Sequence, residues 1–92
     1  MLRYMVRVPL TPEQIDSGRR LGALLRRVRA GRDPETVARS AGISPETLRK
    51  IEVGRIATPS FGTVVAICDA VGLPITDAVD VWRGTTEEPL AM

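Results

Sequence analysis

The sequence predicts an all-α protein with five helices in one domain, and two observations lead to that prediction. Helix-capping residues (Ser, Thr or Asp) stand before four of the expected helices, and apolar residues follow them at helical intervals. Tyr, Phe and Trp occur once each, so the core is aliphatic, which suits packed helices. A chain of 92 residues is long enough for one compact domain.

The first helix is expected to begin at Pro12. Thr11 is a suitable N-cap, Pro12 suits the first helical position, and Gln14 completes a capping box. Apolar residues then form one stripe along the helix: Ile15, Leu21, Leu24, Leu25 and Val28. The helix should end near Ala30 and Gly31, because glycine readily adopts the backbone conformation that closes a helix.

Residues 2–8 come before this helix and alternate β-prone apolar residues with Arg3, Met5 and Arg7, which is typical of a short β-strand. A single strand has unpaired amides on both sides, and the rest of the chain offers no second strand. This strand would therefore pair with its copy in a second subunit and support a dimer. The alternative is an extended tail. Residues 1–10 are accordingly treated as an N-terminal extension.

Two short helices joined by a tight turn are expected over residues 33–54. Asp33 and Ser44 are their N-caps, and each is followed by proline and glutamate. The inward-facing residues are expected to be Val37, Ala38 and Ala41 in the first helix and Leu48 and Ile51 in the second. Gly42 suits a positive φ angle at the turn. The second helix should continue to about Gly54.

The last two helices complete the domain, which spans residues 11–83. Ser60 is expected to cap the fourth helix, and Gly72 to end it. Its buried residues are expected to be Val64, Val65, Ile67, Cys68 and Val71. The fifth helix should run from about Ile75 to Trp82. Residues 84–92 are polar and contain proline, so they are expected to form a flexible tail.

The composition excludes several function classes. The chain has no histidine and shows no carboxylate pair, glycine-rich phosphate loop or nucleophile–base set, so no enzyme, no metal site and no cofactor is expected. The single cysteine, Cys68, is expected to be a small core residue, in keeping with a reducing cytoplasm. The first residues do not resemble a signal peptide, and no apolar run approaches the roughly 20 residues that span a membrane. A cytoplasmic protein is expected.

The net charge is only +2, but the charges are unevenly distributed along the chain. Basic residues outnumber acidic ones between residues 17 and 55, whereas acidic residues outnumber basic ones from residue 56 onward. A basic half beside an acidic half is typical of a protein that meets a polyanion such as DNA with one face. A solvated charged surface would give the same pattern.

The segment 35–54 resembles the helix-turn-helix of phage repressors, the lambda-repressor and Cro-like, or XRE, family. The matching pieces follow in the family's order and near its spacing: Leu21-Gly22, Leu25-Arg26, Val28-Arg29, Val37-Ala38, Gly42-Ile43-Ser44, Thr47-Leu48, Ile51-Glu52-Val53-Gly54, Pro59-Ser60 and Ala70-Val71-Gly72-Leu73. The resemblance implies a five-helix domain that regulates transcription from operator DNA. It also implies a homodimer on a pseudo-palindromic site, with the third helix of each subunit in the major groove.

The resemblance further implies which residues contact DNA. Bases would be read by five residues of the third helix: Pro45, Glu46, Thr47, Arg49 and Lys50. Phosphates would be bound by three residues that follow it: Arg55, Thr58 and Ser60. Arg49 or Lys50 would donate to guanine, and Glu46 would accept from the amine of cytosine. Thr47 or Pro45 would contact a thymine methyl group.

The resemblance also implies an internal ion pair between Arg29 and Glu52 that ties the first helix to the third. Three features depart from the family pattern. Pro34 stands where a glutamine usually grips a phosphate and braces the third helix. The connection from Arg29 to Pro34 is shorter than in the family, and the connection from Glu52 to Pro59 is longer.

Several alternatives stay open from the residues alone. For Arg26 and Arg27, a solvated surface is favoured over phosphate contact. Trp82 either anchors a dimer or packs over the fifth helix, and Thr58 and Ser60 either contact phosphate or only cap the fourth helix. The protein could also be an antitoxin that neutralises a toxin through one of its termini and regulates its own operon. It could instead be a protein-interaction module that does not use DNA.

Overall fold

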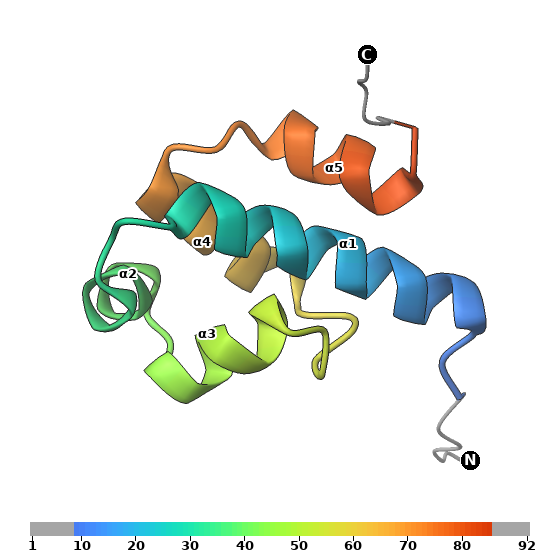
Figure 1. The fold of residues 1–92 in the computed structure, drawn as a ribbon, viewed down its shortest axis with the longest axis horizontal. Coiled ribbons are helices and arrows are strands. Elements are labelled where there is room, and N and C mark those ends of the chain that lie inside the picture. The colour runs from blue at the N-terminus through green and yellow to red at the C-terminus, as the bar shows by residue number, and fades with distance from the viewer. Residues whose placement is uncertain (1–8, 86–92) are drawn as a thin grey trace, which may run out of the picture.

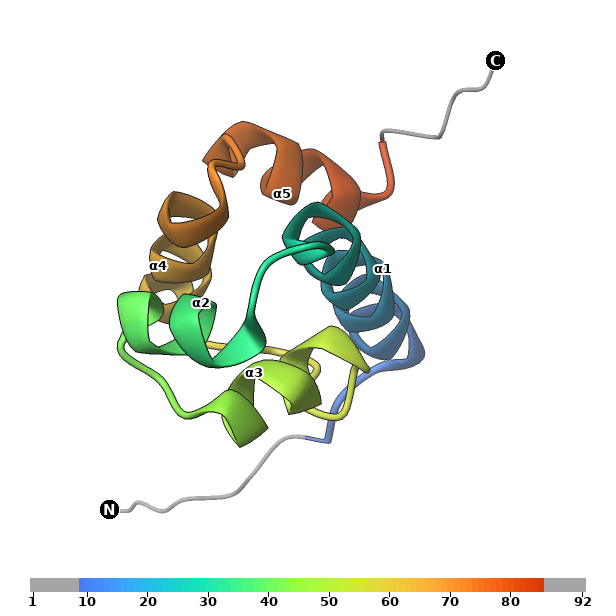
Figure 2. The same cartoon turned by 60° about the vertical axis from the view of Figure 1, so that its left-hand side comes forward.

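The computed structural model describes residues 9–85 and contains five helices there: α1 (Pro12–Arg29), α2 (Pro34–Ala41), α3 (Pro45–Glu52), α4 (Phe61–Val71) and α5 (Ile75–Arg83) (Figure 1). The long helix α1 lies between α5 and α3, while α2 and α4 pack together beside it (Figures 1 and 2). The predicted all-α fold of five helices is confirmed. The strand expected over residues 2–8, and the tail beyond residue 85, lie outside the described residues.

Four helices begin where their capping residues predict. Thr11 Oγ1 accepts a hydrogen bond from the Gln14 amide at 3.1 Å, and Gln14 Oε1 accepts one from the Thr11 amide at 2.9 Å. The side chains that cap α2, α3 and α4 are Asp33, Ser44 and Ser60. Gly42 ends α2 with a φ of 76°, a left-handed conformation that favours glycine. Pro74, without a side-chain hydrogen bond, stands at the start of α5.

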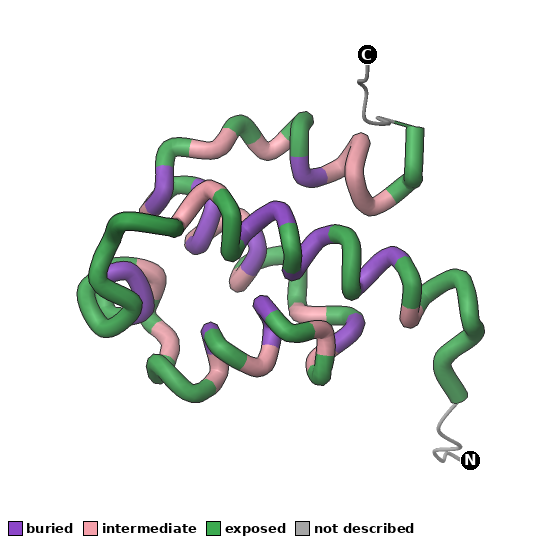
Figure 3. The backbone as a smooth tube through the Cα atoms, in the orientation of Figure 1, coloured by how far each residue is buried: buried purple, intermediate pink, exposed green. Residues whose placement is uncertain are grey.

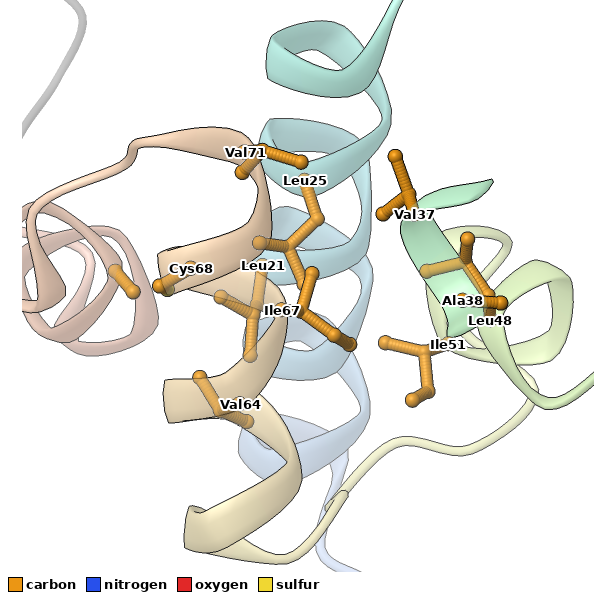
Figure 4. Close-up of a cluster of buried hydrophobic side chains, with 11 residues drawn as sticks. Leu21, Leu25, Val37, Ala38, Leu48, Ile51, Val64, Ile67, Cys68 and Val71 are labelled. Atoms are coloured by element: carbon orange, nitrogen blue, oxygen red, sulfur yellow. The ribbon is translucent and has the colours of Figure 1, made fainter. Parts of the chain in front are cut away.

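The hydrophobic core lies between α1, α4 and the α2–α3 pair (Figure 4). Its most buried side chains come from all five helices: Leu25, Ala38, Leu48, Ile51, Ile67, Cys68, Val71 and, from α5, Ala78. Cys68 is therefore the core residue that the sequence predicts, and burial raises the pKa of its thiol. Val65 is only half-buried, so its expected burial is wrong. The buried positions of α4 form one stripe, and Val65 lies about 100° around the helix from Val64.

Helix α5 is tied to α1 through the carbonyl groups of its last turn. Ser17 Oγ donates to the carbonyl oxygen of Trp82 at 2.8 Å. Arg20 donates through Nε to the carbonyl of Val81 at 3.0 Å and through Nη2 to that of Trp82 at 2.8 Å. The last carbonyls of a helix have no partner within it. The Gly84 amide also donates to the Val81 carbonyl, so the side chains of Ser17 and Arg20 chiefly satisfy the carbonyl of Trp82. Helix α5 ends at Arg83, one residue after the predicted end.

Replacing Asp33 by alanine is expected to lower the Tm at neutral pH and to lower it much less in acid. The amide and hydroxyl of Thr36 both donate to the Asp33 carboxylate and lower its pKa. A carboxyl whose pKa is lower in the folded state adds stability above its unfolded pKa of about 3.9, and this contribution is lost as pH falls through the folded value. Thermal unfolding of both proteins across this range checks the expectation. A difference in Tm that is independent of pH would contradict it.

Candidate nucleic-acid interface

Helix α3 has one buried and one exposed face. Leu48 and Ile51 enter the core, and Glu52 is buried beside α1. Figure 3 shows α3 at the edge of the molecule, with its buried positions on the side nearer α1. The remaining positions face solvent or are half-exposed. The helix is therefore anchored along one side and free to contact a ligand along the other.

Two glycines bring α1 into direct contact with the backbone of α3 and of the segment that follows it. A Cβ at Gly22 would collide with the carbonyl oxygen of Ile51 and lie 2.7 Å from that of Glu52. A Cβ at Gly18 would lie 2.5 Å from the carbonyl oxygen of Ala57. Gly18 and Gly22 are four residues apart and so share one face of α1. This close approach fixes the C-terminal half of α3 against α1.

An ion pair secures the same contact. The guanidinium of Arg29 binds the Glu52 carboxylate through both Nε and Nη2, the second at 3.0 Å from Oε1. The Glu52 side chain is only 5% exposed and that of Arg29 15%. The hydrogen bonds that Arg29 donates to the Glu52 carboxylate raise the pKa of the guanidinium. The pair that the family resemblance implies is thus present, although the connection between α1 and α2 is short.

The five predicted base-reading residues all lie on α3, but they are not equally exposed. Pro45, Glu46 and Arg49 are exposed, whereas Thr47 and Lys50 are half-buried. Lys50 Nζ lies 3.5 Å from Glu46 Oε2, so these two charges partly neutralise each other. No ion pair of Arg49 is found within the described part of the chain. Arg49 is consequently a cation on this face that can bind an external acceptor.

The three predicted phosphate contacts follow α3 in the segment that leads to α4. Arg55, Thr58 and Ser60 are all exposed. Ser60 Oγ accepts a hydrogen bond from the Thr63 amide at 3.2 Å and donates to Thr63 Oγ1 at 2.9 Å. The hydroxyl of Ser60 therefore caps α4, as the structural alternative proposes. A phosphate here would meet the backbone amides of the first turn rather than this hydroxyl.

A hollow lies where the end of α1 meets the starts of α2 and α3. Its lining includes Arg26, Pro34, Pro45, Arg49 and Val53, together with the Arg29–Glu52 pair. The sequence does not assign Arg26 to the site and favours a solvated surface for it. The spacing of Arg26 from two other residues of α1 could have indicated its place, because it lies three residues before Arg29 and four after Gly22. Residues at these intervals share one side of a helix, here the side that faces α3.

A second, apolar groove lies between α4 and α5, with α1 at its base. It is lined by Leu21, Thr58, Pro59, Phe61, Val64, Ile75, Ala78, Val79 and Trp82. Phe61 is 72% exposed, which is unusual for so large an apolar side chain. Trp82 is half-buried in the groove, so it packs against the domain and also presents apolar surface.

Residues 9–85 show neither a metal centre nor a membrane-spanning helix. No group of three or more His, Cys, Asp or Glu side chains is placed there to hold a metal ion. None of the helices in this range is long and apolar enough to cross a membrane.

Comparison with known proteins finds a matching domain family and similar solved structures. A family model described as a helix-turn-helix domain matches residues 20–81, more than half of the chain. The crystal structure of the clp gene regulator ClgR from C. glutamicum is similar, with a TM-score of 0.63 and 28% sequence identity. The alignment covers 87% of this chain and 97% of that one. No curated protein sequence is significantly similar to the chain.

Proposed function

Since the chain belongs to the helix-turn-helix domain family, we propose that it is a sequence-specific transcriptional regulator that reads double-stranded DNA with α3 in the major groove. The observation that carries this proposal is the anchoring of α3 along one side by Leu48, Ile51 and Glu52. A helix held in this way presents its free side chains in a fixed arrangement, which recognition of base edges requires. Such a regulator would act in the cytoplasm, on the nucleoid.

Arg49 and Lys50 are the proposed donors to guanine. Arg49 is free to make two parallel hydrogen bonds to O6 and N7, whereas Lys50 must first leave Glu46. Glu46, once released, can accept from the N4 amine of cytosine. Pro45 and the methyl group of Thr47 would make apolar contacts with thymine. Because the contact between Lys50 and Glu46 must break before either contacts a base, the protein would favour DNA sequences in which both side chains find a base partner.

Arg55 and Thr58 are the proposed side-chain contacts to phosphate, and the amides near Ser60 supply a third contact. Arg55 and Thr58 are exposed immediately beyond α3. The first turn of α4 has amides without partners inside the helix, and it contains no acidic residue that would repel a phosphate. These contacts would position α3 without reading the sequence.

We further propose a homodimer in which the apolar groove between α4 and α5 packs against its copy. The exposed ring of Phe61 and the half-buried Trp82 supply the apolar surface, and Thr58 and Pro59 join the groove to the proposed phosphate segment. A second copy at this place would put its own phosphate segment beside the first, so both α3 helices would approach the same duplex. A pseudo-palindromic site with half-sites about one helical turn apart would fit such a pair.

Light scattering tests the dimer with Phe61→Ser, and Val53→Ser serves as a control because Val53 is an exposed apolar residue directly after α3, outside the groove. The dimer fraction should fall for Phe61→Ser and stay unchanged for Val53→Ser. Equal masses for both variants and the wild type would remove the groove as the interface. Deletion of residues 1–8 in the same experiment tests the strand pairing that the sequence predicts.

Selection of bound duplexes from random DNA by the purified protein tests the proposed function. We expect one enriched sequence with two related half-sites, and an affinity that falls steeply with salt because several phosphates are contacted. The absence of any enriched sequence, together with binding that does not depend on salt, would favour a protein-interaction module instead. An antitoxin would pass this test and additionally require a toxin partner.

A further inference from the structure

We propose that the hollow between α1, α2 and α3 is a binding site for a DNA phosphate and that Arg26 is the cation that binds it. This inference rests on the proposed function, because it places the hollow beside the base-reading face of α3. The same hollow contains Arg49 and Pro45 of that face on one side and Arg26 of α1 on the other. A DNA strand at the edge of the major groove would therefore pass next to Arg26.

The charges within the hollow leave Arg26 without compensation. Arg29 is neutralised by Glu52, and Glu46 is engaged with Lys50 at 3.5 Å. Arg26 is exposed, and within residues 9–85 it makes no ion pair and no side-chain hydrogen bond. With Arg49 it gives the hollow two free guanidinium groups and a net positive charge. Guanidinium groups bind phosphate oxygens through two parallel hydrogen bonds.

The start of α2 borders the hollow but cannot bind a phosphate itself. Pro34 has no N–H group, and the Thr36 amide already donates to the Asp33 carboxylate at 3.1 Å. The carboxylates of Asp33 and Glu35 would also repel a phosphate at this helix terminus. The usual attraction of a helix N-terminus for anions is therefore cancelled here. A phosphate at this place needs a cation from another element, and Arg26 of α1 is in position to provide it.

Arg27 provides a matched control on the same helix. It lies about 100° around α1 from Arg26 and seven residues after Arg20, whose side chain binds the end of α5. Arg27 is thus on the side of α1 that faces away from α3, and it does not line the hollow. Like Arg26, it is exposed. Replacing either residue by alanine removes one positive charge and leaves the core unchanged.

The experiment compares four proteins: the wild-type chain, Arg26→Ala, Arg26→Lys and Arg27→Ala. Their affinities for the selected duplex and for an unrelated duplex are measured over a range of salt concentrations. We expect Arg26→Ala to weaken binding about three- to tenfold for both duplexes and to reduce the slope of log affinity against log salt by about one. Arg26→Lys should keep the slope, because lysine also neutralises a phosphate. Arg27→Ala should match the wild type.

A second measurement locates the contact. Single phosphates of the selected duplex are ethylated one at a time. In each half-site we expect one phosphate whose ethylation weakens binding of the wild type but not of Arg26→Ala. If Arg26→Ala, like Arg27→Ala, keeps the wild-type slope of log affinity against log salt and the wild-type ethylation pattern, the assignment of Arg26 is overturned. The proposed function would remain intact. A wild type that shows no salt-dependent binding to either duplex would overturn the proposed function itself.

Discussion

Replacing Gly22 by valine should destabilise the protein by about 3 kcal/mol and abolish DNA binding. Any Cβ at this position collides with the backbone carbonyls of Ile51 and Glu52, and a backbone cannot move aside as a flexible side chain can. Valine adds two methyl groups to that collision. To accommodate them, α3 must move away from α1, which opens the core around Leu48 and Ile51. Denaturant unfolding and binding of the selected duplex measure the two effects.

Gly62→Ala is the matched control for Gly22→Val. Gly62 lies in the first turn of α4, and nothing lies within 4 Å of the place where its Cβ would stand. Alanine is also the better helix former, so a gain of up to about 1 kcal/mol is expected. Equal stability of Gly22→Val and the wild type would show that α1 and α3 are not held together by backbone contact.

Arg29→Ala is expected to cost about 3 kcal/mol as well, because of the charge it leaves behind. The substitution leaves the Glu52 carboxylate buried without its partner, and removal of one member of a buried pair is strongly destabilising. The exposed pair between Glu46 and Lys50 provides the contrast. Glu46→Ala should change the free energy of unfolding by no more than about 0.5 kcal/mol, because an exposed pair on one helix contributes little.

The double variant Arg29→Leu/Glu52→Leu separates the ion pair from packing. Replacing both partners by apolar residues removes the uncompensated charge, so much of the stability lost in Arg29→Ala should return. The free energies of unfolding of Arg29→Ala, Glu46→Ala and Arg29→Leu/Glu52→Leu are measured by denaturant unfolding. If Arg29→Ala loses no more stability than Glu46→Ala, then the buried pair does not hold α3 in place.

The helices themselves could largely be predicted from the sequence because their signals are local. A capping side chain such as Ser44 binds an amide only three residues away, and Gly42 has the positive φ that glycine directly after a helix predicts. Local signals do not predict which residues of a helix are buried. Val65 lies in an apolar run and is nevertheless only half-buried. Which face of α4 meets α1 depends on the packing of the whole domain, and a run of apolar residues does not reveal it.

The contacts that join distant segments could not be derived from spacing alone. The Arg29–Glu52 pair was expected only through the family resemblance, since the two residues are far apart in the sequence. The attachment of Arg20 and Ser17 to the last turn of α5 has no local signal, because their partners are backbone carbonyls. The hollow that includes Arg26 is likewise created by three helices together.

The structure also clarifies the consequence of Pro34, the main departure from the family pattern. Proline begins α2 without a side chain that grips a phosphate, and the Asp33 carboxylate already accepts from the Thr36 amide. Even so, α3 is held firmly through Gly22 and through the Glu52–Arg29 pair. The orientation of α3 is therefore set from α1, and the contact at the start of α2 is not needed for it.

The most direct test of the central claim, that the exposed face of α3 reads bases, compares the wild type with Arg49→Ala/Lys50→Ala. The quantity to measure is the ratio of affinities for the selected duplex and an unrelated duplex at one salt concentration. The proposed function predicts that the double variant folds normally and still binds DNA weakly, but that this ratio falls by at least about tenfold. An unchanged ratio in the folded double variant would contradict base reading by this face.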